Sequence, residues 1–471
     1  MNKHPLLSKT LVIGLLMLLL SIPLMMVLDV VRERSSHRDS AAEAVARAHA
    51  GPQTIAGPVL YWPYTETFVR QVKAERADGT TREELVTEKR VHIQFPTAMD
   101  TSSQLDTETR LRGIFPVTVY TSHHESQGRF VLRAIEPRTP NGQITLGQPL
   151  VLMDVSDPRG LLSAPKLRLG GVALAVAQAP MGSQAPLPLA AQPDAALLKV
   201  GAEVSFSLVF DLAGTGRIGW VPLADENSVS LRSPWPHPSF GGDFLPRTRT
   251  VSSAGFEATW KVPAMSTQAQ HQFAQMALKS PGEGGDEIEV FSVALQDPVD
   301  VYRLSERATK YGMMFIVLTF AAFFALEMIK RWRIHPMQYL MIGAALVLFF
   351  LLLLSMAEHM AFVWAYLLAS LSCIGLLGHY LRHVLGGWRP GLAMSGLLVA
   401  LYGVLYGILV SEDNALIMGS LLLFGALATI MVATRKLDWY GVLKVDSGPP
   451  PPAAKPRTPR FADTAPGALD G

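Results

Sequence analysis

The sequence contains a single cysteine, Cys373, among 471 residues. One cysteine cannot form an intramolecular disulfide, and it excludes a zinc site built from cysteine pairs. Because Cys373 lies in the middle of an apolar run, we expect it to pack as a small hydrophobic side chain. Any domain that this chain places outside the cytoplasm must therefore be stabilised by core burial alone, which several hundred residues can supply.

Charged residues are also scarce, at 17% of the chain, whereas 49% of the residues are hydrophobic. This composition is too apolar for an ordinary soluble protein of this size, which argues against a cytosolic enzyme. The 41 lysines and arginines nearly balance the 39 aspartates and glutamates, so the net charge is only +2. With no nucleic-acid-binding motif either, the sequence gives no reason to expect DNA or RNA as a partner.

Motifs of catalysis and cofactor binding are missing as well. The sequence has no G-x-S-x-G elbow, no H-E-x-x-H helix and no phosphate-binding P-loop. His123, His124 and Glu125 are neighbours with metal-binding side chains, but successive residues of a strand point to opposite faces, and no second cluster adds ligands. We therefore expect a solvated loop here, and no metal, cofactor or catalytic residue.

Six runs have about the 20 apolar residues that a helix needs to cross about 30 Å of hydrocarbon. They are Leu11 to Leu28, Gly312 to Ile329, Pro336 to Ala357, Met360 to Gly378, Gly391 to Ser411 and Ala415 to Thr434. The first follows a basic lead, Lys3 and Lys9, but it is too long for a cleaved signal peptide and no small-x-small site follows. We interpret it as an uncleaved signal anchor.

Basic residues at the ends of these runs give the orientation. With six spans, every basic cluster falls on one side of the membrane, which is the cytoplasmic side by the positive-inside rule. These clusters are Lys3 and Lys9, Lys330, Arg331 and Arg333, Arg382 and Arg389, and Arg435 and Lys436. The prediction is a multi-pass inner-membrane protein with both termini in the cytoplasm and residues 29–310 outside, which in a Gram-negative cell is the periplasm.

The chain between the first two runs is β-rich. An alanine-rich helical connector, residues 29–56, runs into the helix breaker Gly51-Pro52. Period-two segments between Gly, Pro and Asp punctuation then predict a sandwich-like domain over residues 57–300. The expected strands are Val59 to Val69, Val91 to Phe95, Ile114 to Tyr120, Arg129 to Leu132, Leu150 to Val155, Leu167 to Val176, Val204 to Leu212, Ser228 to Leu231, Phe256 to Val262 and Glu287 to Leu295.

Three segments complete the predicted organisation. Gln178 to Asp194 is rich in Ala, Pro and Gln and predicts a long surface loop or a boundary between two β-rich halves. Residues 301–440 hold a juxtamembrane helix and spans two to six. Residues 441–471 contain four successive prolines and predict a disordered cytoplasmic tail. The fold class is thus an α+β membrane protein with a β-rich periplasmic domain between the first and second of six transmembrane helices.

The segment from Ser233 to Pro246 is the most unusual part of the predicted domain. Its alternating prolines favour an extended chain that holds aromatic side chains in a fixed order. A partner or glycan could bind this display, although aromatic rings that plug the domain edge are the favoured interpretation. The candidate interaction residues are Trp235, His237, Phe240 and Asp243.

Ionisable residues near the spans give the second set of candidates. Glu327 lies beside Lys330 and Arg331, so we expect an interfacial ion pair there. Glu358 and His359 occupy a short turn at the opposite side. Before the second span, Glu306 can pair with Lys310 and Arg303 on one helix face, which forms either a polar collar or a simple interfacial anchor. The candidate membrane-junction residues are Arg303, Glu306, Lys310, Glu358 and His359.

Transport is the main alternative function that the helical spans raise. No carboxylate or histidine lies deep in a run, and paired Gly or Pro interruptions are not evident. Gly403 and Gly407 have the spacing of close helix packing rather than of a pore. A small-molecule transporter or exporter with a periplasmic gating domain stays open as the alternative, and an envelope hydrolase would need a catalytic cluster that the sequence cannot locate.

Several long segments resemble the CreD family of inner-membrane proteins. They include Tyr302 to Gly312 with the apolar run that follows, His335 to Leu340, Glu412 to Leu416, and Ser233 to Pro246 followed by Gly255 to Trp260. The resemblance covers nearly the whole chain except the proline-rich tail. It departs from the family at Tyr61-Trp62, where a plainer aliphatic sequence is expected.

The resemblance implies a protein of cell-envelope integrity, whose production in some bacteria is controlled by the CreBC two-component system and linked to the response to cell-wall-active β-lactams. It brings no catalytic residue. We therefore expect a non-enzymatic role in the envelope-stress response through the periplasmic domain. The expected partners are the lipid bilayer and cell-wall or envelope proteins, with no nucleic acid.

Overall fold

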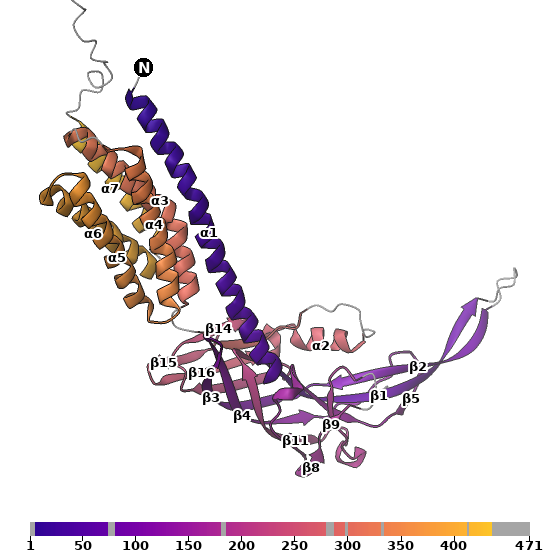
Figure 1. Cartoon of the computed structure of the whole chain (residues 1–471). Helices are drawn as coiled ribbons and strands as arrows, with labels where there is room; N and C mark the ends of the chain where they lie inside the picture. Colours follow the sequence, from indigo (N-terminus) through magenta and orange to yellow (C-terminus); the bar gives the residue numbers. More distant parts are fainter. Residues whose placement is uncertain are drawn as a thin grey trace, which may run out of the picture. The chain divides into compact units, whose positions relative to one another are not determined.

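The computed structural model describes residues 5–73, 81–179, 185–278, 287–296, 300–330, 334–411 and 414–435. The chain divides into two compact units (Figure 1). The helical unit contains Met1–Val31 and Val301–Gly471, and the β-rich unit contains Arg32–Asp300. The tail predicted over residues 441–471 lies outside the described residues, and the predicted domain limits at residues 28, 56, 300 and 440 stay predictions.

Six helices of the described ranges are long and apolar enough to cross a membrane, which confirms the predicted number. They are α1 (Pro5–Ala48), α3 (Val301–Lys330), α4 (Pro336–Ala357), α5 (Phe362–Val384), α6 (Trp388–Val410) and α7 (Ala415–Thr434). Helix α1 is one helix of 44 residues, because charged helix formers continue its turns after the apolar run. It ends shortly before Gly51-Pro52.

Aromatic rings fill the interior of the helical unit. The Tyr402 ring lies 4.7 Å from Phe315 of α3 and 4.6 Å from Phe349 of α4, measured between ring centroids. Cys373 is buried as expected, and it also accepts a hydrogen bond from the Tyr402 hydroxyl at 3.1 Å. Close helix packing occurs at Gly343, where a Cβ would overlap Leu20 of α1, whereas nothing lies within 4 Å of a Cβ at Gly403. The packing role predicted for Gly403 is therefore wrong.

Sheet A of the β-rich unit has a mixed topology. Its central path contains β14 (Pro238–Gly242), β17 (Phe291–Leu295), β12 (Arg217–Trp220), β1 (Gln53–Lys73), β6 (Leu150–Val155), β10 (Leu189–Ala191) and β9 (Ala177–Gln178). Two more strands, β2 (Thr81–Gln94) and β5 (Gln143–Leu146), pair with β1. The pair β1 and β12 is parallel, with Gln53 opposite Ile218.

Sheet B contains the remaining strands of the described residues. In spatial order they are β15 (Thr248–Ser252), β16 (Gly255–Pro263), β13 (Glu226–Ser233), β3 (Ala98–Arg112), β4 (Phe115–Val131), β11 (Glu203–Thr215), β7 (Lys166–Leu169) and β8 (Val172–Ala175). Buried and exposed residues alternate along β3, β4 and β11, as expected for strands with one buried face.

The two sheets bury their inner faces against each other, as in a sandwich. The Trp260 ring of sheet B lies 5.6 Å from Phe291 and 6.3 Å from Trp220 of sheet A. A second core contains Phe273 of α2 (Ala269–Leu278) together with Val59 and other buried residues of β1 and β6. This arrangement confirms the sandwich-like fold class, although α2 was not predicted.

Two predictions for the segments between residues 167 and 194 are wrong. The single strand expected over Leu167 to Val176 is a hairpin, because Gly170 and Gly171 have φ of 56° and 84° and form a tight turn between β7 and β8. The segment from Gln178 to Asp194 is neither one long loop nor a boundary between halves. Its described part contributes to β9 and β10, and Leu189 to Ala191 are buried.

Candidate functional site

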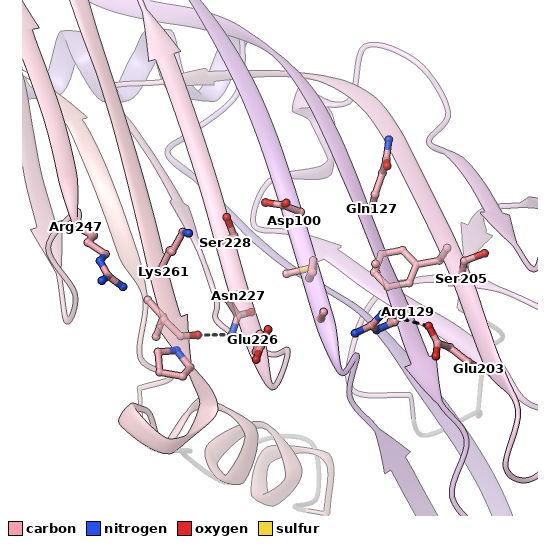
Figure 2. Close-up of a pocket in the computed structure, with 16 residues that line it drawn as sticks. Asp100, Gln127, Arg129, Glu203, Ser205, Glu226, Asn227, Ser228, Arg247 and Lys261 are labelled. Carbon is pink, nitrogen blue, oxygen red and sulfur yellow. Dashed lines mark hydrogen bonds and ion pairs between the residues drawn. The ribbon is translucent and has the colours of Figure 1, made fainter.

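A groove of about 710 Å³ crosses the solvent face of sheet B. We call it the sheet-B groove, and Figure 2 shows its polar side chains on neighbouring strands. Its polar lining consists of Asp100, Gln127, Arg129, Glu203, Ser205, Glu226, Asn227, Ser228, Arg247 and Lys261. All except Asn227, whose side chain is buried, are exposed or half-buried, so these groups are available to a ligand.

Strand register brings these residues together from distant parts of the chain. Asp100 of β3 lies opposite Gln127 of β4 and Ser228 of β13, and Ser228 in turn lies opposite Lys261 of β16. The next row along the strands contains Arg129, which pairs with Ser205 of β11. Two adjacent rows of polar side chains therefore run across the strands and form the two sides of the groove.

The groove carries equal numbers of acidic and basic side chains. Its three carboxylates belong to Asp100, Glu203 and Glu226, and its three cations are Arg129, Arg247 and Lys261. Arg129 and Glu203 form an ion pair at 3.3 Å, with 53% and 58% of their side chains exposed. An exposed pair of this kind contributes little to stability, so both charges can exchange partners when a ligand binds.

The floor of the groove depends on Gly128. A Cβ at this position would lie 2.3 Å from the Ala98 carbonyl oxygen and 2.5 Å from the Phe206 ring. Phe206, which pairs with Gly128 across the strands, therefore covers the glycine with its ring and is only 4% exposed. Nearby, the buried Asn227 amide donates to the Val262 carbonyl at 2.9 Å and accepts from the Ala224 backbone amide. These contacts make a tightly packed floor below the exposed charged groups.

The groove offers charged, amide and hydroxyl groups to a ligand. The six charged groups can form ion pairs with a ligand that carries both signs, and the amide and hydroxyl groups add hydrogen bonds. The groove was not predicted from the sequence, because its residues come from five strands and from Arg247 just before β15. In the sequence, each strand residue looks like an ordinary member of an alternating strand. That alternation was the one available signal.

The predicted aromatic segment packs along the domain core. Trp235 is half-buried, and its indole N–H donates to the carbonyls of His237 at 3.1 Å and Gln296 at 3.2 Å. The Phe240 ring lies 5.9 Å from Trp260 and packs against the core. These contacts agree with the favoured interpretation that the aromatic rings close the domain edge. Partner binding by this segment stays a prediction.

The two polar candidates of the same segment have different surroundings. His237 is exposed. Asp243 holds the chain after β14 in place, because its carboxylate accepts from the Val290 amide at 2.8 Å while its own amide donates to the Val290 carbonyl at 2.7 Å. The structure therefore joins Trp235 and Asp243 to the chain around β17.

The neighbours His123, His124 and Glu125 lie in the middle of β4, so the predicted solvated loop is wrong. His123 is exposed and bonded to Asp211 at 2.7 Å, which raises its pKa, with Glu125 adding to the effect. His124 points to the opposite face and is 1% exposed, and burial lowers its pKa to about 3. In the described residues, no group of three His, Cys, Asp or Glu side chains is arranged to hold a metal.

The predicted junction residues occupy two places in the helical unit. On α3, Lys310 forms the expected ion pair with Glu306 at 3.0 Å, and Arg303 is exposed. After α4, Glu358 accepts a hydrogen bond from the Tyr302 hydroxyl at 3.2 Å, while His359 is exposed. Tyr302 thus links the start of α3 to the turn between α4 and α5.

Glu327 has a different ion-pair partner from the one expected. Its carboxylate binds the ammonium group of Lys9 from α1, whereas Lys330, one of the two expected partners, is exposed. Arg331 lies outside the described residues. The carboxylate also accepts from the Tyr339 hydroxyl at 3.0 Å and the Ile334 amide at 3.2 Å, and Glu327 is only 7% exposed.

A family model and a relative of known name each match most of the chain. The family model described as Inner membrane protein CreD matches residues 5–440. The Inner membrane protein CreD of Escherichia coli (strain K12) is 36% identical over 449 residues, which are 93% of this chain and 95% of that protein.

Solved structures give a much weaker match. An M1 zinc metallopeptidase from Deinococcus radiodurans aligns with 42% of this chain and 42% of its own, at 10% identity and a TM-score of 0.21. A two-domain M1 zinc metallopeptidase with bound L-tryptophan aligns at 12% identity and a TM-score of 0.18, over 43% of this chain and 44% of its own. At these scores the likeness says nothing about activity.

Proposed function

This chain belongs to the CreD family of inner membrane proteins, and from that premise we propose that it maintains cell-envelope integrity and contributes to the response to cell-wall-active β-lactams. In this proposal the β-rich unit lies in the periplasm, both termini lie in the cytoplasm, and the unit acts without catalysis by binding a partner. The basic residues at the helix ends support this orientation.

The observation that carries the binding role is the sheet-B groove. Its three carboxylates and three cations lie above a tightly packed floor and face solvent. A segment of an envelope protein that carries both charges complements this pattern, whereas a polyanion or an apolar ligand would leave half of the charges without partners. The family description gives a location in the inner membrane and no reaction, which supports a non-enzymatic role.

Crosslinking in intact cells tests the groove directly. We would place a photoreactive residue at Gln127 or Ser205, which line the groove, and at Thr121, which is exposed on the same strand as Gln127 but outside the groove. We expect Gln127 and Ser205 to capture the same envelope protein and Thr121 to capture none. Equal capture from all three positions, or capture of cell-wall fragments instead, would contradict the proposal.

A charge exchange tests whether the groove contributes to cell-envelope function. Exchanging Arg129 and Glu203 keeps their ion pair but reverses the local charge pattern, so we expect higher sensitivity to β-lactams at normal protein levels. The matched control exchanges Arg232 and Glu257, an exposed cross-strand pair at 3.1 Å that does not line the groove. Equal sensitivity of both exchanged variants and the parent chain would rule the groove out.

A further inference from the structure

A second cavity, of about 290 Å³, lies between α5 and α6 in the helical unit. Small residues line it where the two helices meet: Gly375, Gly378, Gly391 and Ser395. Its size is close to the lower end of small-ligand pockets, about 300 Å³. The sheet-B groove belongs to the other unit, so an inference about this cavity is independent of the proposed function.

Glycine contacts define the shape of the cavity. A Cβ at Gly378 would lie 2.5 Å from Ser395 Oγ, and a Cβ at Gly391 would lie 3.2 Å from the Arg382 Cα. At these two positions the helices approach each other closely. At Gly375, by contrast, a Cβ would have no neighbouring atom within 4 Å, so this residue faces free space. The cavity is therefore an opening beside tightly packed positions.

The charge around the cavity has one sign. Arg382 lines it together with His379 and Trp388, and none of the described lining residues is acidic. The guanidinium carbon of Arg382 lies 4.2 Å from the centroid of the Trp388 ring. This stacking uses the face of the guanidinium, so its edge keeps N–H donors that suit phosphate oxygens. The N-terminus of α6, at Trp388, adds positive potential, and no described side chain caps it.

The surroundings of the cavity indicate that an anionic ligand there would be a lipid headgroup. Leu392 lines the cavity and is 60% exposed, and Leu376 on α5 is 62% exposed. Large exposed apolar side chains on a spanning helix face lipid, so the cavity opens beside acyl chains. Basic pockets between spanning helices suit anionic headgroups. We propose that this cavity binds the headgroup of one anionic phospholipid, with its phosphate at Arg382 and its acyl chains along Leu376 and Leu392.

Native mass spectrometry of the full-length chain in a mild detergent tests this proposal. The chain is titrated with phosphatidylglycerol and, separately, with zwitterionic phosphatidylcholine. We expect preferential binding of one phosphatidylglycerol, and about fivefold weaker binding in Arg382→Gln, which is the effect of one cation near the membrane surface. Arg389→Gln, which removes the same charge next to the cavity but not from its lining, should retain parental affinity.

A steric pair of variants keeps the test informative if Arg382→Gln does not fold. Gly375→Leu extends into the cavity from a position whose Cβ would meet no neighbouring atom, so it should remove the bound lipid. Gly396→Leu on α6 also starts from a position with nothing within 4 Å but lies outside the lining, and it should bind like the parent chain. Equal losses in the two leucine variants, or in Arg382→Gln and Arg389→Gln, would overturn the proposal. So would displacement of the lipid by inorganic phosphate, which would make the occupant a free anion.

Discussion

The ammonium group of Lys9 in α1 forms an ion pair with the carboxylate of Glu327 in α3, across 318 positions of sequence. The same ammonium group donates to the Ile334 carbonyl at 2.8 Å, and Tyr339 donates to the other carboxylate oxygen. Glu327 is the one charged residue in the sequence of the six predicted spans, and its side chain is almost fully buried. The pair therefore holds the first helix against the helices that follow the β-rich unit.

The effects of removing the two partners of this pair should not be additive. We predict that Lys9→Gln lowers the free energy of unfolding by about 3 kcal/mol, because it leaves the buried Glu327 carboxylate without its partner. Glu327→Gln should cost less, because the Lys9 ammonium group that it leaves is only half-buried. The double variant should lose less than the sum of the two. Denaturant titration of the purified chain in detergent micelles measures all three values.

Lys330→Gln is the control for this pair, since Lys330 lies three residues from Glu327 and is exposed. We expect it to change stability by less than about 0.5 kcal/mol. Additive losses for Lys9→Gln and Glu327→Gln would show that the two side chains do not interact in the folded protein.

His124 makes the β-rich unit sensitive to acid. Burial lowers its pKa to about 3, whereas the unfolded chain protonates it near 6.5. Between these values the unfolded state binds more protons, so stability falls as the pH is lowered from 6.5 toward 3, by up to about 1.4 kcal/mol per pH unit. His124→Gln should flatten this slope in thermal unfolding of the full-length chain between about pH 4.5 and 8.

His123 gives the opposite dependence and serves as the comparison. Its bond to Asp211 raises its pKa, so its contribution is complete below pH 6.5 and is lost as the pH rises through the raised value. His123→Gln should therefore leave the acid slope in place. An unchanged slope in His124→Gln would assign the acid sensitivity to other groups.

Gly128 should tolerate no side chain. Alanine there places a carbon 2.3 Å from the Ala98 carbonyl oxygen and forces the Phe206 ring out of its place. We predict that Gly128→Ala destabilises the β-rich unit by about 1–3 kcal/mol, the usual cost of overpacking a core. It should also abolish crosslinking from Ser205, because the groove floor changes.

Gly241→Ala is the matched control for this substitution. Its Cβ would lie 3.9 Å from Ser292 Oγ, which is an ordinary contact on another strand. Thermal unfolding of both variants separates the close approach at Gly128 from a general effect of replacing a strand glycine. A melting temperature of Gly128→Ala equal to that of Gly241→Ala would contradict the tight packing at this site.

Charge reversal at Glu306 should affect function more than stability. The ion pair with Lys310 is partly exposed, so its loss costs at most about 1 kcal/mol. If this helix face acts as a polar collar, Glu306→Lys impairs growth under envelope stress at normal protein levels. Glu43→Lys breaks a comparable i, i+4 pair with Arg47 on α1 and should have no such effect.

Growth of the Glu306→Lys strain like the parent strain, with equal protein in the membrane, would leave interfacial anchoring as the role of this segment. Protein levels measured by immunoblot separate that outcome from loss of the chain.

The sequence predicted the elements whose signals are local. Apolar runs of membrane length located the six candidate spanning helices of the described residues. Period-two segments predicted the sandwich-like unit, because burial of one face dictates the residues of each strand. Gly170-Gly171 was missed as a turn, although two successive glycines are a known hairpin signal. His124 was missed as a core residue because the polar run His123 to Glu125 was predicted as a loop, where no side chain is expected to be buried.

Long-range contacts could not be predicted in the same way. The partner of Glu327 was sought among its neighbours in sequence, but in the folded chain Lys9 is the residue that brings a cation to it. The sheet-B groove likewise depends on register between strands such as β3 and β13, which strands β4 to β12 separate in the sequence. The sequence of one segment does not reveal which distant segment it contacts, so neither the Lys9–Glu327 pair nor the β3–β13 pair could be predicted.

The parallel pairing of β1 and β12 has a consequence for the order in which the protein assembles. The Gln53 side chain donates to the carbonyl of Ala213, 160 residues later. The residues that follow pair in the same way, with Thr54 opposite Gly219 and Ile55 opposite Trp220. If the chain crosses the membrane from its N-terminus, β1 emerges long before the strand that completes its sheet. During that interval the groups of Gln53 to Ile55 that will bond to β12 face solvent or other chains, so the speed of export sets how long this end of β1 is open to aggregation.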